Sequence, residues 1–259
     1  MQGRLTASHG AAMARQYIRS RYQQIRLRSF ASDEPYFQPF THSKGWSDIV
    51  GTNVLGWHEG RQHKQRFIVV SAHYDHLGKR AGHIFNGADD NASGVAAMLS
   101  LAQYIAEHGS QYSIIFVATD AEEKGLYGAK AFVASPPVPL AAIWVNLNLD
   151  MLAEGGRRKR LYVTSSKALP ALIHLVESAI SGAGLCLVKG HRSHRGNVAG
   201  RGHINWRQAS DHAAFAAKKI PYLFLGVSNH SRHHNQNDNS EKIDQNFLPA
   251  PQKPPCHCY

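Results

Sequence analysis

Five short segments of this sequence carry side chains of the kinds that bind divalent metal ions, and the order of these side chains along the chain is informative. They supply a histidine, an aspartate, a pair of glutamates, a second aspartate and a late histidine. A set of nitrogen and oxygen ligands without thiolates is typical of a catalytic zinc site with an open position, and less so of a closed structural site. In chain order the residues are His73, Asp90, Glu122 and Glu123, Asp150, and His234.

This inventory is sufficient for two ions that share one ligand. The two oxygens of Asp90 could bridge the ions, with His73 and Asp150 on one side and Glu123 and His234 on the other. Two zinc ions about 3.5–4 Å apart can hold a water molecule between them and lower its pKa toward neutrality. The sequence therefore predicts a pair of zinc ions that activates water.

Three further acids have predicted supporting roles. Glu122 is left over beside a ligand, and an unligated glutamate next to an activated water is suited to act as general base. Asp75 lies two residues after His73 and could fix the tautomer of that imidazole. Asp238 could do the same for His234.

Taken singly, the segments have plainer interpretations. The Asp-Asp pair at 89–90 could be part of a helix cap, and the Glu-Glu pair at 122–123 could be the solvated start of a helix. Asp150 is harder to explain in this way, because a carboxylate at the end of an apolar strand is costly to bury without a partner. The combination of all five segments favours a metal site.

Buried strands are predicted directly before three of the candidate residues. His73, Glu122 and Asp150 follow the carboxyl ends of continuous apolar runs of strand length. Ligand sites of open α/β sheets lie at this edge. The three runs cover residues 67–72, 113–119 and 141–149.

Helices alternate with further strands along the rest of the chain, although residues 30–66 are mostly turn-rich. This alternation predicts an α/β fold: a single-domain, three-layer sandwich in which a mixed, mostly parallel sheet carries helices on both faces. The predicted helices cover residues 11–25, 92–108, 126–134, 168–181 and 211–217, and the further strands cover 48–57, 161–164, 185–188 and 222–227.

The length of 259 residues fits one domain of this kind. We expect the domain to cover residues 1–248, and the Pro-rich residues 249–259 to form an unstructured tail. No apolar run approaches the roughly 18 residues of a membrane span. Three cysteines are too few for a disulfide framework. Cys186 is predicted to be a small buried hydrophobe, and Cys256 and Cys258 lie in the tail.

The formal net charge of +11 arises mainly from two stretches, residues 157–160 and 189–207. Such an excess can attract nucleic acid or another acidic partner. However, the sequence has no zinc-finger spacing, aromatic RNA-binding signature or recognisable DNA-reading helix. We therefore interpret both stretches as solvated basic loops and predict no nucleic-acid partner.

The candidate segments together resemble the two-zinc aminopeptidase family, which includes secreted bacterial leucine-type aminopeptidases and has glutamate carboxypeptidase and glutaminyl cyclase as relatives. The resemblance extends over about residues 3–244. It rests on the stretches VVSAHYDHLG (69–78), NGADDNASGVAA (86–97), ATDAEEKGLYGAKAF (118–132), NLNLDM (146–151), SDHAAF (210–215) and HHNQNDNSEKID (233–244).

The resemblance implies the zinc exopeptidase fold, two zinc ions and peptide substrates. It gives the same roles as the chemical argument, with Glu122 as general base and Asp90 among the ligands. It also implies a cis peptide bond between Asp90 and Asn91. The ligands that it implies are His73, Asp90, Glu123, Asp150 and His234.

Three features depart from the family pattern. A tyrosine that often precedes the last ligand histidine is here His233, which we expect to donate a hydrogen bond to the developing oxyanion. Family members usually have a leader sequence, and none is visible here. If a leader is missing from this sequence, we expect a periplasmic or secreted location. They also usually end in a C-terminal helix, where this chain has prolines. Exposed apolar surface is therefore expected.

The sequence predicts a zinc-dependent metallo-aminopeptidase that removes N-terminal residues from peptides. A glutaminyl cyclase would reuse much of this ligand set with one zinc ion. A carboxypeptidase of the same architecture would carry extra domains. A non-enzymatic peptide-binding protein on this fold is a third alternative, but it would be expected to have lost ligands, and none is lost.

Overall fold

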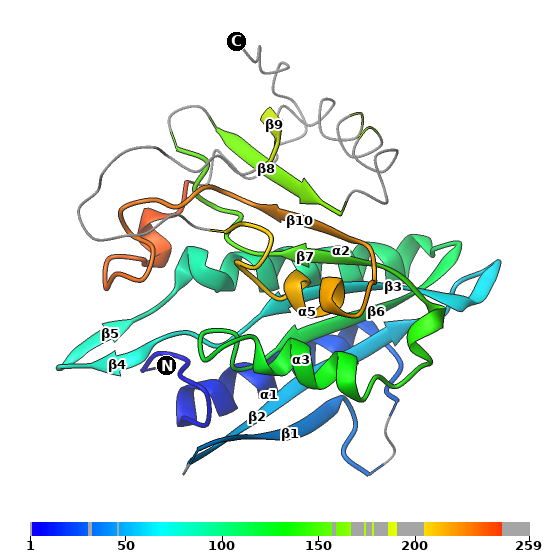
Figure 1. The fold of residues 1–259 in the computed structure, drawn as a ribbon, viewed down its shortest axis with the longest axis horizontal. Helices are drawn as coiled ribbons and strands as arrows, with labels where there is room; N and C mark the ends of the chain where they lie inside the picture. Colours follow the sequence, from blue (N-terminus) through cyan, green and yellow to red (C-terminus); the bar gives the residue numbers. More distant parts are fainter. Residues whose placement is uncertain are drawn as a thin grey trace.

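Eight strands form one sheet in the computed structural model, which describes residues 2–30, 33–45, 47–156, 159–166, 174, 178, 186–190 and 205–244 (Figure 1). Their order across the sheet is β1-β2-β6-β3-β7-β10-β8-β9. The strands are β1 (Phe37–Lys44), β2 (Ser47–His58), β3 (His63–His73), β6 (Tyr112–Thr119), β7 (Ile143–Leu149), β8 (Arg160–Ser165), β9 (Cys186–Lys189) and β10 (Tyr222–Gly226). A separate hairpin pairs β4 (Gly78–Arg80) with β5 (His83–Phe85).

The centre of the sheet is parallel. Strand β3 pairs in parallel with β6 and with β7, and β7 pairs in parallel with β10. The register sets His73 opposite Thr119 and Ser71 opposite Asn148. The carboxyl ends of β3, β6 and β7 therefore meet at one edge of the sheet, where the sequence predicts the site.

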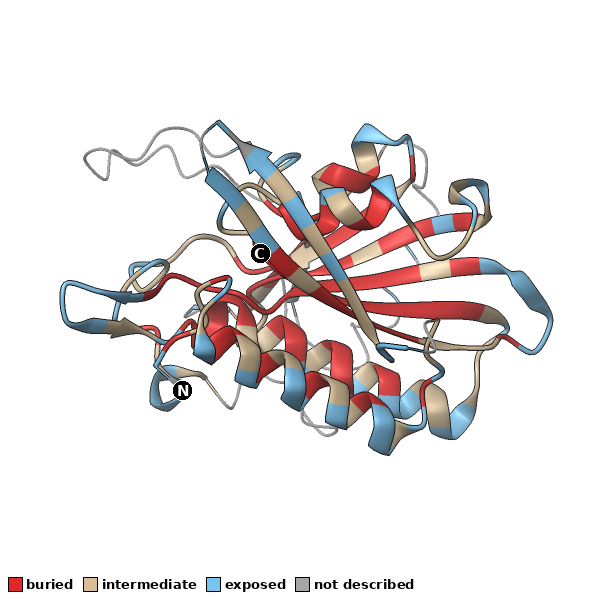
Figure 2. Ribbon diagram, turned by 90° about the horizontal axis from the view of Figure 1, so that it is seen from below, coloured by how far each residue is buried: buried red, intermediate tan, exposed pale blue. Residues whose placement is uncertain are grey.

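Helices cover both faces of the sheet (Figures 1 and 2). Helices α1 (His9–Ile25) and α2 (Gly94–His108) pack on one face, and α3 (Tyr127–Ala134) and α5 (His212–Ala217) on the other. Successive residues of β3 alternate between these layers: Val70 packs in the cluster with α1 and α2, whereas Val69 packs with α3 and α5. This confirms the predicted three-layer α/β fold with a mixed sheet.

Helix α1 illustrates how the outer layers form. Its buried residues Ala11, Ala14, Ile18 and Tyr22 recur at helical spacing and face the sheet. The hydroxyl of Ser8 accepts a hydrogen bond from the Ala11 N–H at 3.2 Å and so caps the first turn. The opposite side of α1 exposes Tyr17 and Met13.

Strand β1 and the separate β4–β5 hairpin were not predicted from the sequence. Strand β1 lies at the sheet edge and pairs only with β2 in the described residues, so none of its described side chains is buried and no apolar run marks it. The β4–β5 hairpin is too short to leave a pattern. Most of the predicted helix 168–181, the side chain of Cys186 and the predicted tail lie outside the described residues.

Among the helices of the described residues, none combines the length and the apolar character needed to cross a membrane.

Candidate metal centre

The strand ends deliver the candidate side chains to one place. His73 is the last residue of β3 and Asp150 directly follows β7, while Glu122 and Glu123 lie on the turn after β6. The Nε2 atom of His73 lies 3.3 Å from Oδ1 of Asp150. The predicted edge of the sheet therefore gathers these residues.

Asp90 lies between two groups of potential ligands. Its Oδ1 is 3.3 Å from His73 Nε2, and its Oδ2 is 3.3 Å from His234 Nε2. His234 Nε2 is in turn 3.1 Å from Oε2 of Glu123. One carboxylate thus faces His73 and Asp150 with one oxygen and Glu123 and His234 with the other.

The donor atoms of this group are of the kinds that bind zinc. Within the described residues, Oδ2 of Asp90, Oε1 of Glu123 and Oδ1 of Asp150 are buried and make no hydrogen bond. Buried carboxylate oxygens without hydrogen bonds are costly, and metal coordination is one way to satisfy them. Imidazole nitrogens and carboxylate oxygens are ligands that zinc takes in catalytic sites.

The loop that carries Asp90 is held by several side chains. The peptide bond between Asp90 and Asn91 is cis, as the resemblance implied. Asn91 Oδ1 accepts from the Gly94 N–H at 3.0 Å and from the Met151 N–H at 3.1 Å, which ties the loop to the start of α2 and to the end of β7. The Asp90 carboxylate is therefore presented by a rigidly connected turn.

Asp238 has a different role from the one predicted. The sequence suggested that it orients His234, but its Oδ1 and Oδ2 accept from the backbone N–H groups of Asp89 at 2.8 Å and Asp90 at 3.0 Å. Its carboxylate is thus occupied with the loop that carries Asp90. The contact joins residues almost 150 positions apart, which local spacing cannot reveal.

Asp75 lies beside His73, as predicted, and makes additional contacts. The Nδ1 atom of His73 is 3.2 Å from the Asp75 carbonyl oxygen and 3.6 Å from its Oδ1. The same carboxylate accepts from the N–H groups of Glu122 at 3.0 Å and Glu123 at 3.3 Å. Asp75 therefore connects the β3 and β6 ends of the centre.

Burial and neighbouring charges set the protonation of the acids in opposite directions. Burial raises the pKa of Glu122 well above its ordinary value, and Asp150, Asp211 and Glu123 add to this against the opposing effect of His73. Burial would also raise the pKa of Asp90, but the imidazoles around it hold that pKa well below the usual range. The geometry thus favours proton uptake at Glu122 and ionisation at Asp90.

His76 is a neighbour of the centre that sequence reasoning missed. Its ring is fully buried, with Nδ1 2.8 Å from Oε1 of Glu123 and 3.7 Å from Oδ2 of Asp90. The signal was available, because His76 belongs to the same short segment as His73. His233, whose Nε2 is 3.4 Å from Asp90 Oδ2, also lies at this side.

A second polar cluster lies beside the Asp90 loop. His230 places Nε2 3.0 Å from Oδ2 of Asp89 and Nδ1 3.0 Å from Oε2 of Glu154. Arg232 lies 2.7 Å from the other oxygen of Glu154. Apart from Asp89, which belongs to the Asp-Asp pair, these residues were not singled out from the sequence. They connect the loop before His233 to the turn that contains Asp89.

Asp211 is a further buried acid near the centre. It accepts a hydrogen bond from the hydroxyl of Thr119, the last residue of β6. Burial raises its pKa to about 7. It lies within a stretch that resembles the family, but the sequence assigned it no role.

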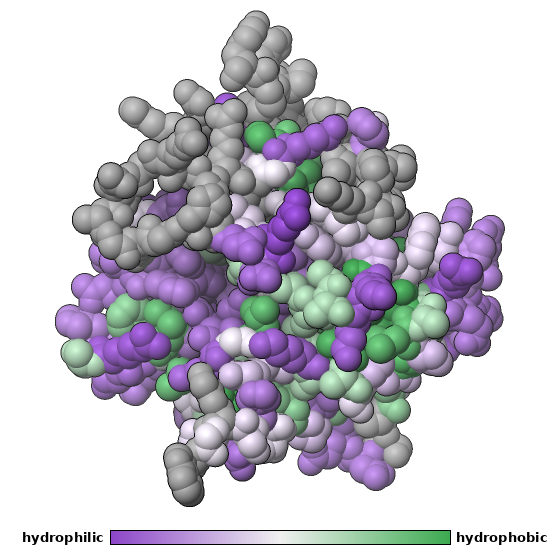
Figure 3. Space-filling view, in the orientation of Figure 1, coloured by the Kyte–Doolittle hydropathy of each residue, from purple (hydrophilic) through white to green (hydrophobic). Residues whose placement is uncertain are grey.

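A groove of about 1100 Å³ extends between α3 and α5, on the face seen in Figure 3. Glu122 and Glu123 contribute to its lining. Hydrophobic side chains gather over these two helices, and basic residues border them. The lining includes Val133, Ala213 and Ala217 together with Lys124, Lys130, Arg207 and Lys218.

Comparison with known proteins gives evidence on the family of this chain that is independent of the site geometry. Residues 53–252 match the model of peptidase family M28. The chain is 31% identical over 185 residues to the alkaline phosphatase isozyme conversion protein of Escherichia coli (strain K12). This match covers 66% of the chain and 52% of that protein, so the chain spans about half the length of this relative.

Solved structures share the fold. A Zn-dependent exopeptidase from Parabacteroides distasonis superposes with a TM-score of 0.70 at 19% identity, covering 95% of this chain and 88% of that one. BSAP, a zinc aminopeptidase from Bacillus subtilis, gives a TM-score of 0.60 at 25% identity over 79% of this chain and 48% of that one. With a family match over most of its length and the acids and histidines gathered at one sheet edge, this chain belongs to peptidase family M28.

Proposed function

We propose that this chain is a zinc-dependent aminopeptidase that removes N-terminal residues from peptides. The observation that carries the proposal is the position of Asp90, whose two oxygens lie 3.3 Å from His73 and 3.3 Å from His234. A carboxylate shared in this way between two groups of ligands is what a pair of ions requires.

The proposed ligands divide into two sets that share Asp90. His73 and Asp150 would hold one zinc ion, and Glu123 and His234 would hold the other. When bound, such a pair polarises a carbonyl group and lowers the pKa of water. Asp75 keeps the His73 ring in place through its contacts with Nδ1.

Glu122 is the proposed general base. It takes the proton from the attacking water and delivers it to the amine that leaves. Its burial and the surrounding carboxylates raise its pKa, which supports proton uptake during attack. Its backbone is fixed by the hydrogen bond from its N–H to Asp75.

His233 is the proposed hydrogen-bond donor to the oxyanion. Its ring lies beside His234, with centroids 4.0 Å apart, and its side chain is 22% exposed, so one edge can face a substrate. A donor aimed at the developing negative charge stabilises the transition state more than the ground state.

Exopeptidase action is proposed from the relatives and from the local charge. Two similar structures are those of a Zn-dependent exopeptidase and a zinc aminopeptidase. The buried carboxylates around the centre also suit a substrate whose free α-amine is positively charged. The groove between α3 and α5 offers room for a peptide beside Glu122.

A panel of aminoacyl-arylamides and their N-acetylated counterparts tests the proposal. We expect zinc-dependent release of arylamine only from substrates with a free α-amine. Product masses should show addition of water, whereas a cyclase acting on glutamine-first peptides would release ammonia. Equal cleavage of the N-acetylated substrates would contradict aminopeptidase action.

A further inference from the structure

The segment at residues 3–6 contacts two loops that carry proposed metal ligands. Three main-chain carbonyls accept hydrogen bonds from the Arg4 guanidinium. The first belongs to the residue after His73, and the other two lie four and three residues before Asp90. Nε donates to the Tyr74 carbonyl oxygen at 2.7 Å, Nη1 to that of Asn86 at 2.5 Å and Nη2 to that of Gly87 at 2.9 Å.

The main chain of the same segment is also fixed to the loop after β3. The Arg4 carbonyl accepts from the His76 N–H at 3.0 Å, and the Thr6 hydroxyl lies 3.4 Å from Oδ2 of Asp75. At Gly3, an added Cβ would lie only 2.6 Å from the Cα of Gly78. The segment therefore fits closely along residues 74–78 and can hold Arg4 in a defined place.

We propose that Arg4 is a positioning residue of the metal centre, which holds the loops of His73 and Asp90 at the separation that two ions sharing Asp90 require. The inference rests on the proposed zinc-dependent function. A guanidinium suits this role because its planar array of N–H groups can reach several acceptors in fixed directions, whereas an ammonium is a point charge. Arg4 acts through the two loops and not on the reacting atoms.

Because Arg4 is charged, a positioning role and a purely electrostatic role predict opposite changes in zinc affinity when it is removed. Asp75, Asp90, Glu123 and Asp238 all lie close enough to act on the guanidinium. A fixed cation near the ligands opposes the binding of further cations, so on electrostatics alone its removal would strengthen zinc binding. Positioning predicts the opposite sign, because loops that are no longer held lose metal affinity, typically by about 10–100-fold.

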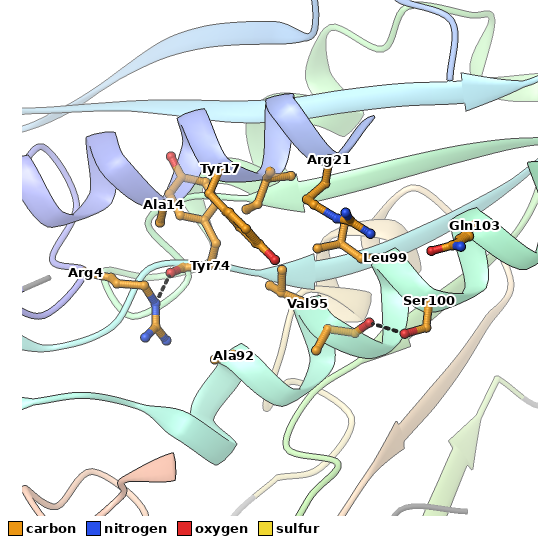
Figure 4. A pocket seen from close by; sticks show the side chains of 12 residues that line it. Arg4, Ala14, Tyr17, Arg21, Tyr74, Ala92, Val95, Leu99, Ser100 and Gln103 are labelled. Atoms are coloured by element: carbon orange, nitrogen blue, oxygen red, sulfur yellow. Dashed lines mark hydrogen bonds between the residues drawn. The ribbon is translucent and has the colours of Figure 1, made fainter. Parts of the chain in front are cut away.

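The surroundings of Arg4 allow chemical rescue. Arg4 lies at one end of a cavity of about 330 Å³ between α1 and α2, with Tyr74 beside it (Figure 4). A small guanidinium cation can enter such a space when the arginine side chain is removed. Arg21 lines the same cavity but donates to Gln24 at 2.7 Å, within its own helix, and so provides a matched control.

The test measures the zinc dissociation constant by competition with a chromophoric chelator. Arg4→Ala should weaken zinc binding about 10–100-fold, and added ethylguanidinium should restore much of the lost zinc affinity. Arg4→Lys keeps the charge but should remain weak, because it cannot reach three carbonyls. Arg21→Ala should bind zinc as the wild type does. Circular dichroism of the metal-free proteins should show that all variants are folded.

Unchanged or tighter zinc binding by Arg4→Ala, with normal binding by the wild type, would overturn the inference alone. Loss of the fold in both metal-free Arg4 variants would also overturn it, since Arg4 would then serve the whole domain. A wild-type protein without zinc affinity would overturn the proposed function and this inference with it.

Discussion

Asp238 accepts a hydrogen bond from the backbone N–H of Asp90 at 3.0 Å, and its other oxygen accepts from the preceding N–H at 2.8 Å. The two residues are 148 positions apart in the chain. The carboxylate of Asp238 therefore holds the proposed bridging ligand by its main chain, while the side-chain oxygens of Asp90 face His73 and His234.

Asp238→Asn should weaken zinc binding by about 10–100-fold, because an amide can accept with one group only and must turn its NH₂ toward the second N–H. Competition with a chelator measures the affinity. Glu241→Gln removes one charge from an exposed residue nearby and should have no effect. If both variants bind zinc equally well, Asp238 does not support the Asp90 loop.

The purified protein should bind up to two zinc ions per chain. A strong chelator should abolish peptide hydrolysis, and added zinc should restore it, because the proposed sets around His73 and His234 share Asp90. Elemental analysis measures the bound zinc, and the arylamide assay measures the hydrolysis. Full activity in metal-free protein would exclude the zinc mechanism.

Glu122→Gln and Glu123→Gln should separate the base from the ligand. The first should retain both metal ions and lose kcat by a factor of about 10²–10⁴, because only proton transfer is removed. The second should instead lose metal affinity, because Glu123 lies 3.1 Å from the proposed ligand His234. Normal hydrolysis by Glu122→Gln would show that another group is the base.

His233 and His234 are adjacent and both face Oδ2 of Asp90. We expect His234→Ala to lose zinc, whereas His233→Ala should keep zinc and lose kcat about 10²-fold, the usual scale for an oxyanion donor. His233→Tyr should retain or improve kcat, since a phenol also donates. Equal kcat values for wild type and His233→Ala would remove His233 from the mechanism.

The buried carboxyl of Asp120 predicts a pH dependence of stability. Burial and the nearby Asp75 raise its pKa from 3.8 to about 6, although it accepts hydrogen bonds from Thr52 N–H and Tyr74 Oη–H. The folded chain therefore holds this proton more tightly than the unfolded chain, so stability should fall as pH rises between these values.

Urea unfolding of the metal-free protein at several pH values measures this effect. Asp120→Asn should flatten the dependence of the unfolding free energy on pH over the same window. Asp48→Asn, at an exposed position of β2, should leave it unchanged. The same slope in Asp120→Asn as in the wild type would mean that Asp120 does not titrate there.

Sequence alone determined which residues could bind metal and which elements carry them. Apolar runs of strand length predicted β3, β6 and β7, and a histidine or carboxylate at the end of such a run is conspicuous because burial without a partner is costly. Parallel pairing then requires these ends to share an edge, so the meeting of His73 and Asp150 could be predicted.

The contacts that hold those residues in place come from segments that are distant in the sequence. Arg4, Asp238 and His230 reach the Asp90 loop from segments that are about 80 to 150 positions away in the chain. A loop residue carries no periodicity that reports the direction of its side chain. Such contacts arise when the helices and sheet pack and bring distant turns together, and therefore no local spacing in the sequence encodes them.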